Sequence, residues 1–157
     1  MKRIKLLLLS LLLLNSMHAF ADTDDQSGGF VEALQMPAWY DHNGETQPLK
    51  PGVKLQSGDV IRTGDNARVL LRLEEGSLIK LGENGTLDLD TIKKPEQSGG
   101  IFAALLEVSK GAFRFTTTEI GKLKKRDIKV KIGVVTVGIR GTDVWGKSSD
   151  EKDILCL

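Results

Sequence analysis

Only one histidine stands where it could act as a catalytic base. His42 lies in Asp41-His42-Asn43-Gly44, and the Asn-Gly pair is typical of the tip of a β-hairpin. A Ser-His-Asp triad stays open as an alternative, but the sequence lacks the Gly-x-Ser-x-Gly turn that presents a nucleophilic serine. We therefore interpret His42 as a surface loop residue.

Neither the carboxylates nor the possible metal ligands form a convincing catalytic or metal site in the sequence. Glu74, Glu75, Asp88 and Asp90 are the candidates for the paired acids of glycoside hydrolysis, and we expect all four in exposed turns or on outward strand faces. A general acid needs a raised pKa and hence shielding from water, so solvated charge is the favoured interpretation. The single cysteine and one histidine cannot complete a transition-metal site. We predict no catalytic residue, no metal and no cofactor, so the protein is not expected to be an enzyme.

A basic segment is the first candidate for a binding surface. It comprises Lys122, Lys124, Lys125 and Arg126, with further lysines at Lys129 and Lys131. Such a cluster could meet anionic envelope polymer or lipid head groups near a charged surface. The alternative is a solvated hairpin tip that leads into a strand with lysines on its outer face.

The tryptophans give a second candidate surface. Trp39 and Tyr40 follow Pro37, which favours an edge strand, and exposed rings there would stack on sugar rings. Trp145 lies in a closing strand, and we expect it in the core. Together with the basic segment, Trp39 and Tyr40 would form a site for envelope glycan or peptidoglycan.

Composition narrows the class of protein. The 157 residues are 27% charged and 40% hydrophobic, with 17 Gly, 4 Pro and 1 Cys. This balance excludes a collagen-like chain, a disulfide scaffold and a Cys-rich zinc domain. The 22 Lys and Arg nearly cancel the 21 Asp and Glu, so the basic excess of a nucleic-acid-binding protein is missing. The length suits one domain.

The first 21 residues have the order of a cleavable signal peptide. A basic start, an apolar run and a small-residue cleavage site follow one another: Lys2, Arg3, Lys5, Leu6 to Leu14, and Ala19-Phe20-Ala21. The apolar run is shorter than the roughly 20 residues that a membrane span requires. We expect cleavage after Ala21, a periplasmic or secreted protein that does not span the membrane, and a flexible lead-in over residues 22–29.

From Phe30 onward apolar and polar residues alternate, as they do in half-buried strands. The alternation is clear in residues 67–73, 86–90 and 128–132. Turn sequences separate the segments: Asn43-Gly44, Ser57-Gly58-Asp59, Gly64-Asp65-Asn66, Glu75-Gly76 and Glu83-Asn84-Gly85. Residues 30–157 are therefore predicted to form a single all-β domain of short antiparallel strands, folded as a sandwich or a rolled sheet.

The middle of the domain is harder to assign. Ile101 to Val108 fits either a short helix or a strand, and we predict a strand that pairs with Ala112 to Thr117 through a turn at Ser109-Lys110-Gly111. Residues 91–100 are rich in Lys, Pro, Gln, Ser and Gly, which indicates a surface connection between two halves of one domain.

Two stretches carry a family resemblance. The first runs from Gly52 to Leu89 and the second from Thr136 to Trp145, with a closing Arg-Gly-Thr. In this order the stretches resemble the FecR-type periplasmic domain, a β-rich module. The positions that match the family pattern are Gly58, Asp59, Thr63, Gly76, Ser77, Arg140, Gly141 and Thr142.

The matching residues also have a physical interpretation. Asp59 can fix a tight turn by accepting hydrogen bonds from backbone amides, and Gly76 supplies a positive φ. Arg140 could be buried and paired with a carboxylate, for which Asp59 is the candidate. We therefore interpret these residues as determinants of the fold and not as a ligand site.

The resemblance implies a function in the cell envelope. It suggests an interaction or sensing module that binds an envelope protein, with strand addition to an exposed sheet edge as the expected mode. FecR-type signalling proteins also have a segment that engages a sigma factor and a membrane helix, where this chain has the predicted signal peptide. We therefore expect no direct control of a cytoplasmic sigma factor. The apolar end from Ile154 to Leu157 suggests either a truncated chain or an edge that a partner completes.

Overall fold

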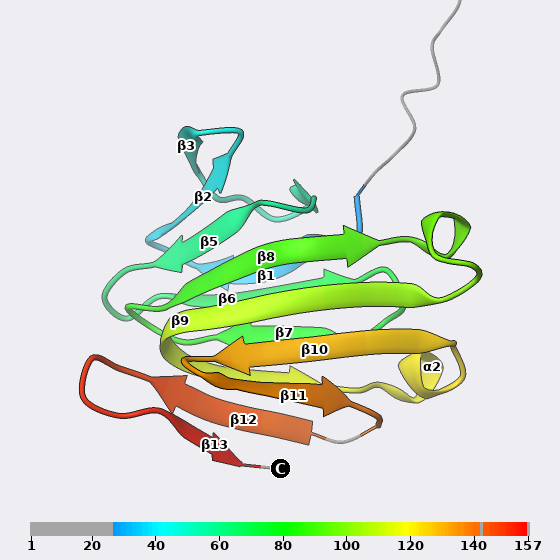
Figure 1. Cartoon of the computed structure of the whole chain (residues 1–157). Coiled ribbons are helices and arrows are strands. Elements are labelled where there is room, and N and C mark those ends of the chain that lie inside the picture. The colour runs from blue at the N-terminus through cyan, green and yellow to red at the C-terminus, as the bar shows by residue number, and fades with distance from the viewer. Residues whose placement is uncertain (1–26, 142, 157) are drawn as a thin grey trace, which may run out of the picture.

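The computed structural model describes residues 27–141 and 143–156. The signal peptide predicted for residues 1–21, most of the predicted lead-in, and Thr142 lie outside the described residues. The described part of the chain forms one curled, nearly all-antiparallel β-sheet, a half-barrel whose two halves pack against each other (Figure 1). This confirms the predicted all-β class and the rolled sheet.

We call the two halves sheet A and sheet B, and the long strand β9 belongs to both. Sheet A has the strand order β4 (Lys54–Leu55), β1 (Gly29–Gln35), β6 (Arg68–Leu73), β7 (Leu78–Leu81), β9 (Phe102–Thr116), β12 (Asp143–Ser148) and β13 (Ile154–Cys156). Sheet B has the order β3 (Glu45–Pro48), β2 (Ala38–His42), β5 (Val60–Thr63), β8 (Thr86–Lys93), β9, β10 (Arg126–Ile132) and β11 (Val135–Ile139).

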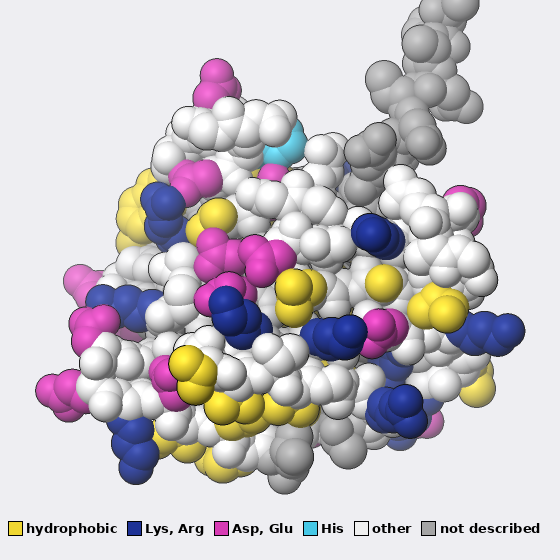
Figure 2. Space-filling view, in the orientation of Figure 1, with side chains coloured by type: hydrophobic (Ala, Val, Ile, Leu, Met, Phe, Trp, Pro, Cys, Tyr) yellow, Lys and Arg dark blue, Asp and Glu magenta, His cyan; other side chains and the backbone are white. Residues whose placement is uncertain are grey.

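The predicted alternation determines which side chains enter the core. In β6, Val69, Leu71 and Leu73 are buried, while the two arginines of the strand point outward. Strands β8 and β10 follow the same rule, because successive side chains of a strand lie on opposite faces. Charged side chains therefore collect on the outward faces, as Figure 2 shows for the side of the molecule that carries sheet B. The three predicted strands are confirmed.

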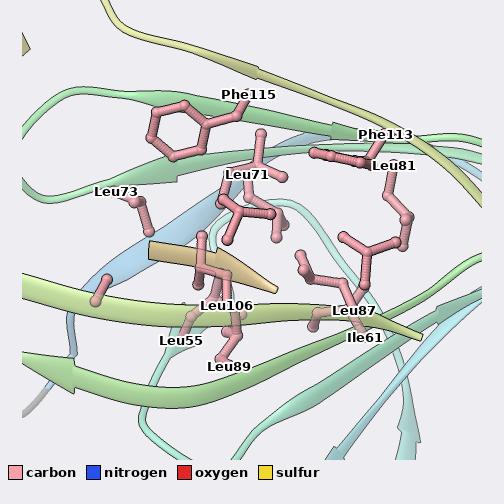
Figure 3. Packing of buried hydrophobic residues seen from close by; sticks show 14 of the residues in the cluster. Leu55, Ile61, Leu71, Leu73, Leu81, Leu87, Leu89, Leu106, Phe113 and Phe115 are labelled. Atoms are coloured by element: carbon pink, nitrogen blue, oxygen red, sulfur yellow. The ribbon is translucent and has the colours of Figure 1, made fainter. Parts of the chain in front are cut away.

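The core lies between the two sheets. Figure 3 shows leucine and phenylalanine side chains of sheet A meeting those of sheet B. The largest fully buried side chains include Phe115, Leu71 and Leu73 from sheet A and Phe102, Leu87 and Leu106 from sheet B. Burying one such side chain stabilises the fold by about 1.5 to 3 kcal/mol, so this interior is the main source of stability.

The predicted hairpin between residues 101 and 117 is wrong. These residues form the single strand β9, which pairs with β8 and β10 through its first part and with β7 and β12 through its second part. Gly111 has a φ of +90°, and the pairing with β8 shifts register beside it. The glycine thus bends the strand from one sheet into the other, where we had expected it to reverse the chain.

A short helix follows β9 and returns the chain to sheet B. This helix, α2 (Glu119–Lys122), begins at Thr118, whose hydroxyl accepts a hydrogen bond from the Gly121 amide. Strand β10 then pairs with the first part of β9 in parallel, the one parallel pair among the described strands. A single-turn 3-10 helix, η2 (Pro95–Gln97), interrupts the connection predicted over residues 91–100, and β8 extends into that connection as far as Lys93.

The turns lie where the sequence places them, but the lead-in ends earlier than expected. Asn43, Asn66 and Asn84 all have positive φ, as the predicted turns require. Gly28 and Gly29 are buried, and the Gly28 amide donates to the Leu55 carbonyl. A Cβ on Gly29 would lie 2.5 Å from the Arg72 carbonyl oxygen. Gly28 and Gly29 are therefore part of the folded domain and not of the lead-in. At Gly29 the neighbouring strand leaves no room for a side chain.

Candidate functional site

Asp59 fixes the turn before β5. Its carboxylate is buried, accepts a hydrogen bond from the Gln56 amide at 2.8 Å, and lies 2.7 Å from Nδ1 of His42. His42 is at the hairpin tip that was predicted, but its ring is directed to Asp59 and not to solvent alone. Sequence reasoning missed this contact because the two residues are 17 positions apart and on different strands.

The buried hydroxyl of Thr63 also holds main chain in place. It donates to the Gly82 carbonyl oxygen at 2.6 Å and accepts from the Gly85 amide at 2.8 Å. Thr63 thereby joins the end of β5 to the single turn that connects β7 to β8. The threonine of the family pattern contacts only the protein's own backbone in these bonds.

The buried ion pair that we predicted between Arg140 and Asp59 is wrong. Arg140 is exposed, and the carboxylate of Asp59 already has His42 and the Gln56 amide as partners. Arg140 directly follows β11, whose pairing with β10 ends at Ile139. Thr142, the last residue of the predicted Arg-Gly-Thr motif, lies outside the described residues.

A different arginine makes the buried pair. The Arg126 side chain is 7% exposed and its Nη1 atom lies 3.6 Å from Oε2 of Glu75, whose side chain is 0% exposed. Arg126 also donates to the hydroxyls of Ser77 and Thr117, both at 3.1 Å. Neither oxygen of Glu75 accepts a hydrogen bond from the described residues. Our expectation that Glu75 lies in an exposed turn is therefore wrong.

Two of the family-pattern glycines, Gly76 and Gly141, lie near this pair, together with Gly121 of α2. Gly76 has a φ of +110°, and its carbonyl oxygen accepts a hydrogen bond from the Thr118 hydroxyl at the start of α2. A Cβ on Gly121 of α2 would lie 2.6 Å from the Glu75 carboxylate, and a Cβ on Gly141 would lie 4.0 Å from the Arg126 guanidinium. Arg126 thus connects the turn before β7 to the residue that follows β9, and its guanidinium lies close to Gly121 of α2.

The predicted basic surface is broken up in the structure. Arg126 is buried, so it cannot belong to a surface patch. Lys122 pairs with Glu119, and Lys124 donates to the Glu74 carbonyl oxygen. Of the four, Lys124 and Lys125 form no ion pair with a described residue. The lysines that follow in β10 are also neutralised, Lys129 by Asp127 and Lys131 by Glu107.

The aromatic residues are arranged differently from the prediction. Trp39 is 37% exposed and faces outward opposite Arg62, whereas Tyr40 is opposite Ile61 and packs against the core. Adjacent residues of a strand point to opposite faces, so Trp39 and Tyr40 do not form a joint surface. Trp145 was expected in the core but is 53% exposed, because Val144 and Gly146 take the inward positions of β12.

The outward face of sheet B carries mutually compensating charges. Glu107 pairs with Lys131, and Asp88 accepts a hydrogen bond from the Ser109 hydroxyl. Acidic and basic side chains lie next to each other over this face (Figure 2). Burial raises the pKa of Asp88, and the charges of Asp90 and Glu107 add to the rise.

The raised pKa of Asp88 predicts a pH-dependent gain from Asp88→Asn. Because the folded carboxyl binds its proton more tightly than the unfolded one, Asp88 favours folding below its unfolded pKa of 3.8 and opposes folding as the pH rises through the folded value. The variant should therefore melt at a higher temperature than the parent at pH 7 and at the same temperature at pH 3. Lower stability of the variant at pH 7 would contradict this assignment.

Strand β11 is the sheet edge best suited to accept another strand. Four described strands lie at edges, namely β3, β4, β11 and β13, each paired with one neighbour. β3 contains Pro48 and is polar, while β4 and β13 have two and three residues. β11 has five residues, with neither a charge nor a proline; its first residue, Val135, and the preceding turn residue, Val134, are exposed.

Within residues 27–141 and 143–156, no group of three His, Cys, Asp or Glu side chains is arranged to hold a metal ion. In the same residues no helix has the length and hydrophobicity needed to cross a membrane.

The curled sheet, its buried motif residues and its open edge define an all-β module. The family model described as FecR protein matches residues 59–157. The chain belongs to this family, which confirms the resemblance seen in the sequence and suggests a periplasmic sensing or signalling module. Searches of curated proteins and of solved structures found no match.

Proposed function

We propose that this protein is a non-enzymatic sensing or interaction module of the cell envelope that binds an envelope protein through strand β11. Its location is periplasmic or extracellular after removal of the predicted signal peptide. Membership of the FecR family supports the signalling role. The observation that carries the proposal is the open, uncharged and partly apolar edge of β11.

The edge supplies affinity through its main chain. Half of the amide and carbonyl groups of an edge strand point away from its neighbour, so an added strand can pair with them. Val134 in the turn between β10 and β11 and Val135 at the start of β11 are exposed, and burying them would add apolar contact. Edges without a charge or a proline are uncommon in proteins that stay unpartnered, since such edges associate.

The residues that the sequence suggested for a glycan site do not lie together. Trp39 and Tyr40 lie on opposite faces of β2, and Arg126 of the basic segment is buried. Figure 1 places β2 and α2 in different regions of the molecule. A glycan site therefore requires a different surface of the protein.

Photo-crosslinking from β11 tests the proposal. A photoreactive amino acid at Val135 is expected to give a discrete protein adduct in cells that express the full chain, and the same group at Thr46 on the polar edge β3 is expected to give none. Thr136→Asp places a charge on the β11 edge and should reduce the adduct without lowering the melting temperature. Equal adducts from Val135 and Thr46, or an adduct unaffected by Thr136→Asp, would contradict strand addition at β11.

A further inference from the structure

The outward face of sheet A carries a row of side chains that differs from the rest of the surface. The register places Leu70 beside Lys80, Lys80 beside Arg114, and Arg114 beside Trp145. Residues paired across neighbouring strands point to the same face. The alternate residues Val69, Leu81, Phe113 and Val144 are buried in the core, so the row of four faces outward.

A hollow follows Leu70, Lys80 and Arg114 of this row, and Trp145 lies beside it, next to Arg114. One depression of about 490 Å³ lies over β1, β6, β7 and β9 and includes Leu70, Lys80 and Arg114 in its lining. A second, of about 400 Å³, includes Lys110 and Lys147. Both share Arg68, Gly82 and Ala112, and the small side chains of Gly82 and Ala112 leave the space between them open. We call the combined depression the sheet A groove.

Basic side chains outnumber acidic ones in the groove. Its lining includes five exposed cations, Arg68, Lys80, Lys110, Arg114 and Lys147, and one acid, Glu83, whose carboxylate accepts a hydrogen bond from the Asn66 amide. Of these five, only Arg114 forms an ion pair with a described residue, Asp143. The hydrogen bond that Arg114 donates lowers the pKa of the Asp143 carboxyl. On the outward face of sheet B, by contrast, Lys129 and Lys131 are paired with Asp127 and Glu107.

The position of the groove determines what kind of ligand fits it. β6, β7 and β9 have neighbours on both sides, so their main-chain groups are already paired and cannot accept an added strand. A ligand here must bind side chains alone. Cations attract carboxylate or phosphate groups, and the exposed ring of Trp145 offers a flat apolar face to a sugar ring. An acidic peptide would use the cations but gain little from the tryptophan.

We propose that the sheet A groove binds an anionic polysaccharide, with Lys80, Arg114 and Lys147 contacting its acidic groups and Trp145 stacking on a sugar ring. This site is separate from β11 and does not depend on the proposed strand addition. Because the cations are exposed, their attraction is long-ranged and screened by salt.

Three polymers test the proposal. Polygalacturonate carries both rings and charges, dextran carries rings alone, and poly-glutamate carries charges alone. The full chain should bind polygalacturonate, and it should bind the other two at least about tenfold more weakly. Raising the salt from 50 to 500 mM should weaken the polygalacturonate complex. Equal binding of poly-glutamate would mean that the groove recognises acidic protein segments, and would overturn the proposal.

Matched variants locate the site. Lys80→Glu with Lys147→Glu should lower affinity for polygalacturonate roughly tenfold, and Trp145→Ala should lower it about fivefold. Lys122→Glu with Lys125→Glu changes the net charge equally, at the end of α2 and in the segment after it, and should have little effect. Thr136→Asp on β11 should also leave binding unchanged. If the α2 variant weakens binding as much as the groove variant, or if Trp145→Ala has no effect, the proposed site is wrong. Melting temperatures show that each variant is folded.

Discussion

Replacing Arg126 with alanine is expected to lower the free energy of unfolding by about 3 to 5 kcal/mol. The substitution leaves the carboxylate of Glu75 buried without its opposite charge, and a buried charge without a partner is strongly destabilising. It also removes the donor for the hydroxyls of Ser77 and Thr117. Urea unfolding followed by circular dichroism measures the loss.

Arg140→Ala is the matched control for Arg126→Ala. Arg140 is exposed, so its loss should change the free energy of unfolding by less than about 0.5 kcal/mol. Combining Glu75→Leu with Arg126→Met should recover most of the stability, because apolar residues of similar size can replace a buried ion pair at little cost. A loss below about 1 kcal/mol for Arg126→Ala, or an equal loss for Arg140→Ala, would show that the pair at Arg126 is not the one that matters.

Replacing Gly111 with alanine is expected to cost about 2 to 4 kcal/mol. Gly111 has a φ of +90°, which a residue with a side chain adopts only with strain, and a Cβ there would lie 2.5 Å from the Cα of Gly85. The obstacle is main chain, so it cannot rotate away. The loss should appear as a lower urea midpoint with an unchanged slope.

Gly138→Ala provides the comparison for Gly111→Ala. Gly138 lies in β11, its φ is not positive, and a Cβ there would meet no atom within 4 Å. Alanine at this position should therefore be neutral or stabilise the protein by up to about 1 kcal/mol. Similar losses from the two substitutions would mean that the bend in β9 does not depend on Gly111.

The buried ion pair was predictable from the same alternation that identified the strands. Leu71 and Leu73 point inward, and the next positions of that phase are Glu75 and Ser77. Arg126 likewise shares the phase of Ile128 and Val130. Extending each alternation by one period of two residues places Glu75 and Arg126 on the buried side. The run of lysines around Arg126 suggested a solvated surface, and this obscured the pattern.

Two other features depend on tertiary structure and could not be predicted. Ser109-Lys110-Gly111 has the composition of a turn, yet β9 continues through it because its two parts have different neighbours in the two sheets. Trp145 follows Val144, and either could have been the inward residue of β12. Their positions are set by pairing with β9. Local sequence gives the alternation but not the choice of phase.

Strand pairing also determines which charged side chains lie together on the surface. Three of the five lysines between residues 122 and 131, namely Lys122, Lys129 and Lys131, are paired with nearby acids. The cations of the sheet A groove are far apart in sequence and come together only when β6, β7, β9 and β12 are aligned. A surface of this kind gives no signal in any single segment of the chain.

Amide hydrogen exchange on the complex isolated by crosslinking from β11 tests the central claim most directly. In the free protein, the β11 amides that do not bond to β10 should exchange rapidly, while the amides of the central strand β6 exchange slowly. Strand addition predicts that the rapidly exchanging β11 amides become protected in the complex. If the partner binds and these amides exchange as fast as before, the contact is made by side chains, and β11 does not accept a strand.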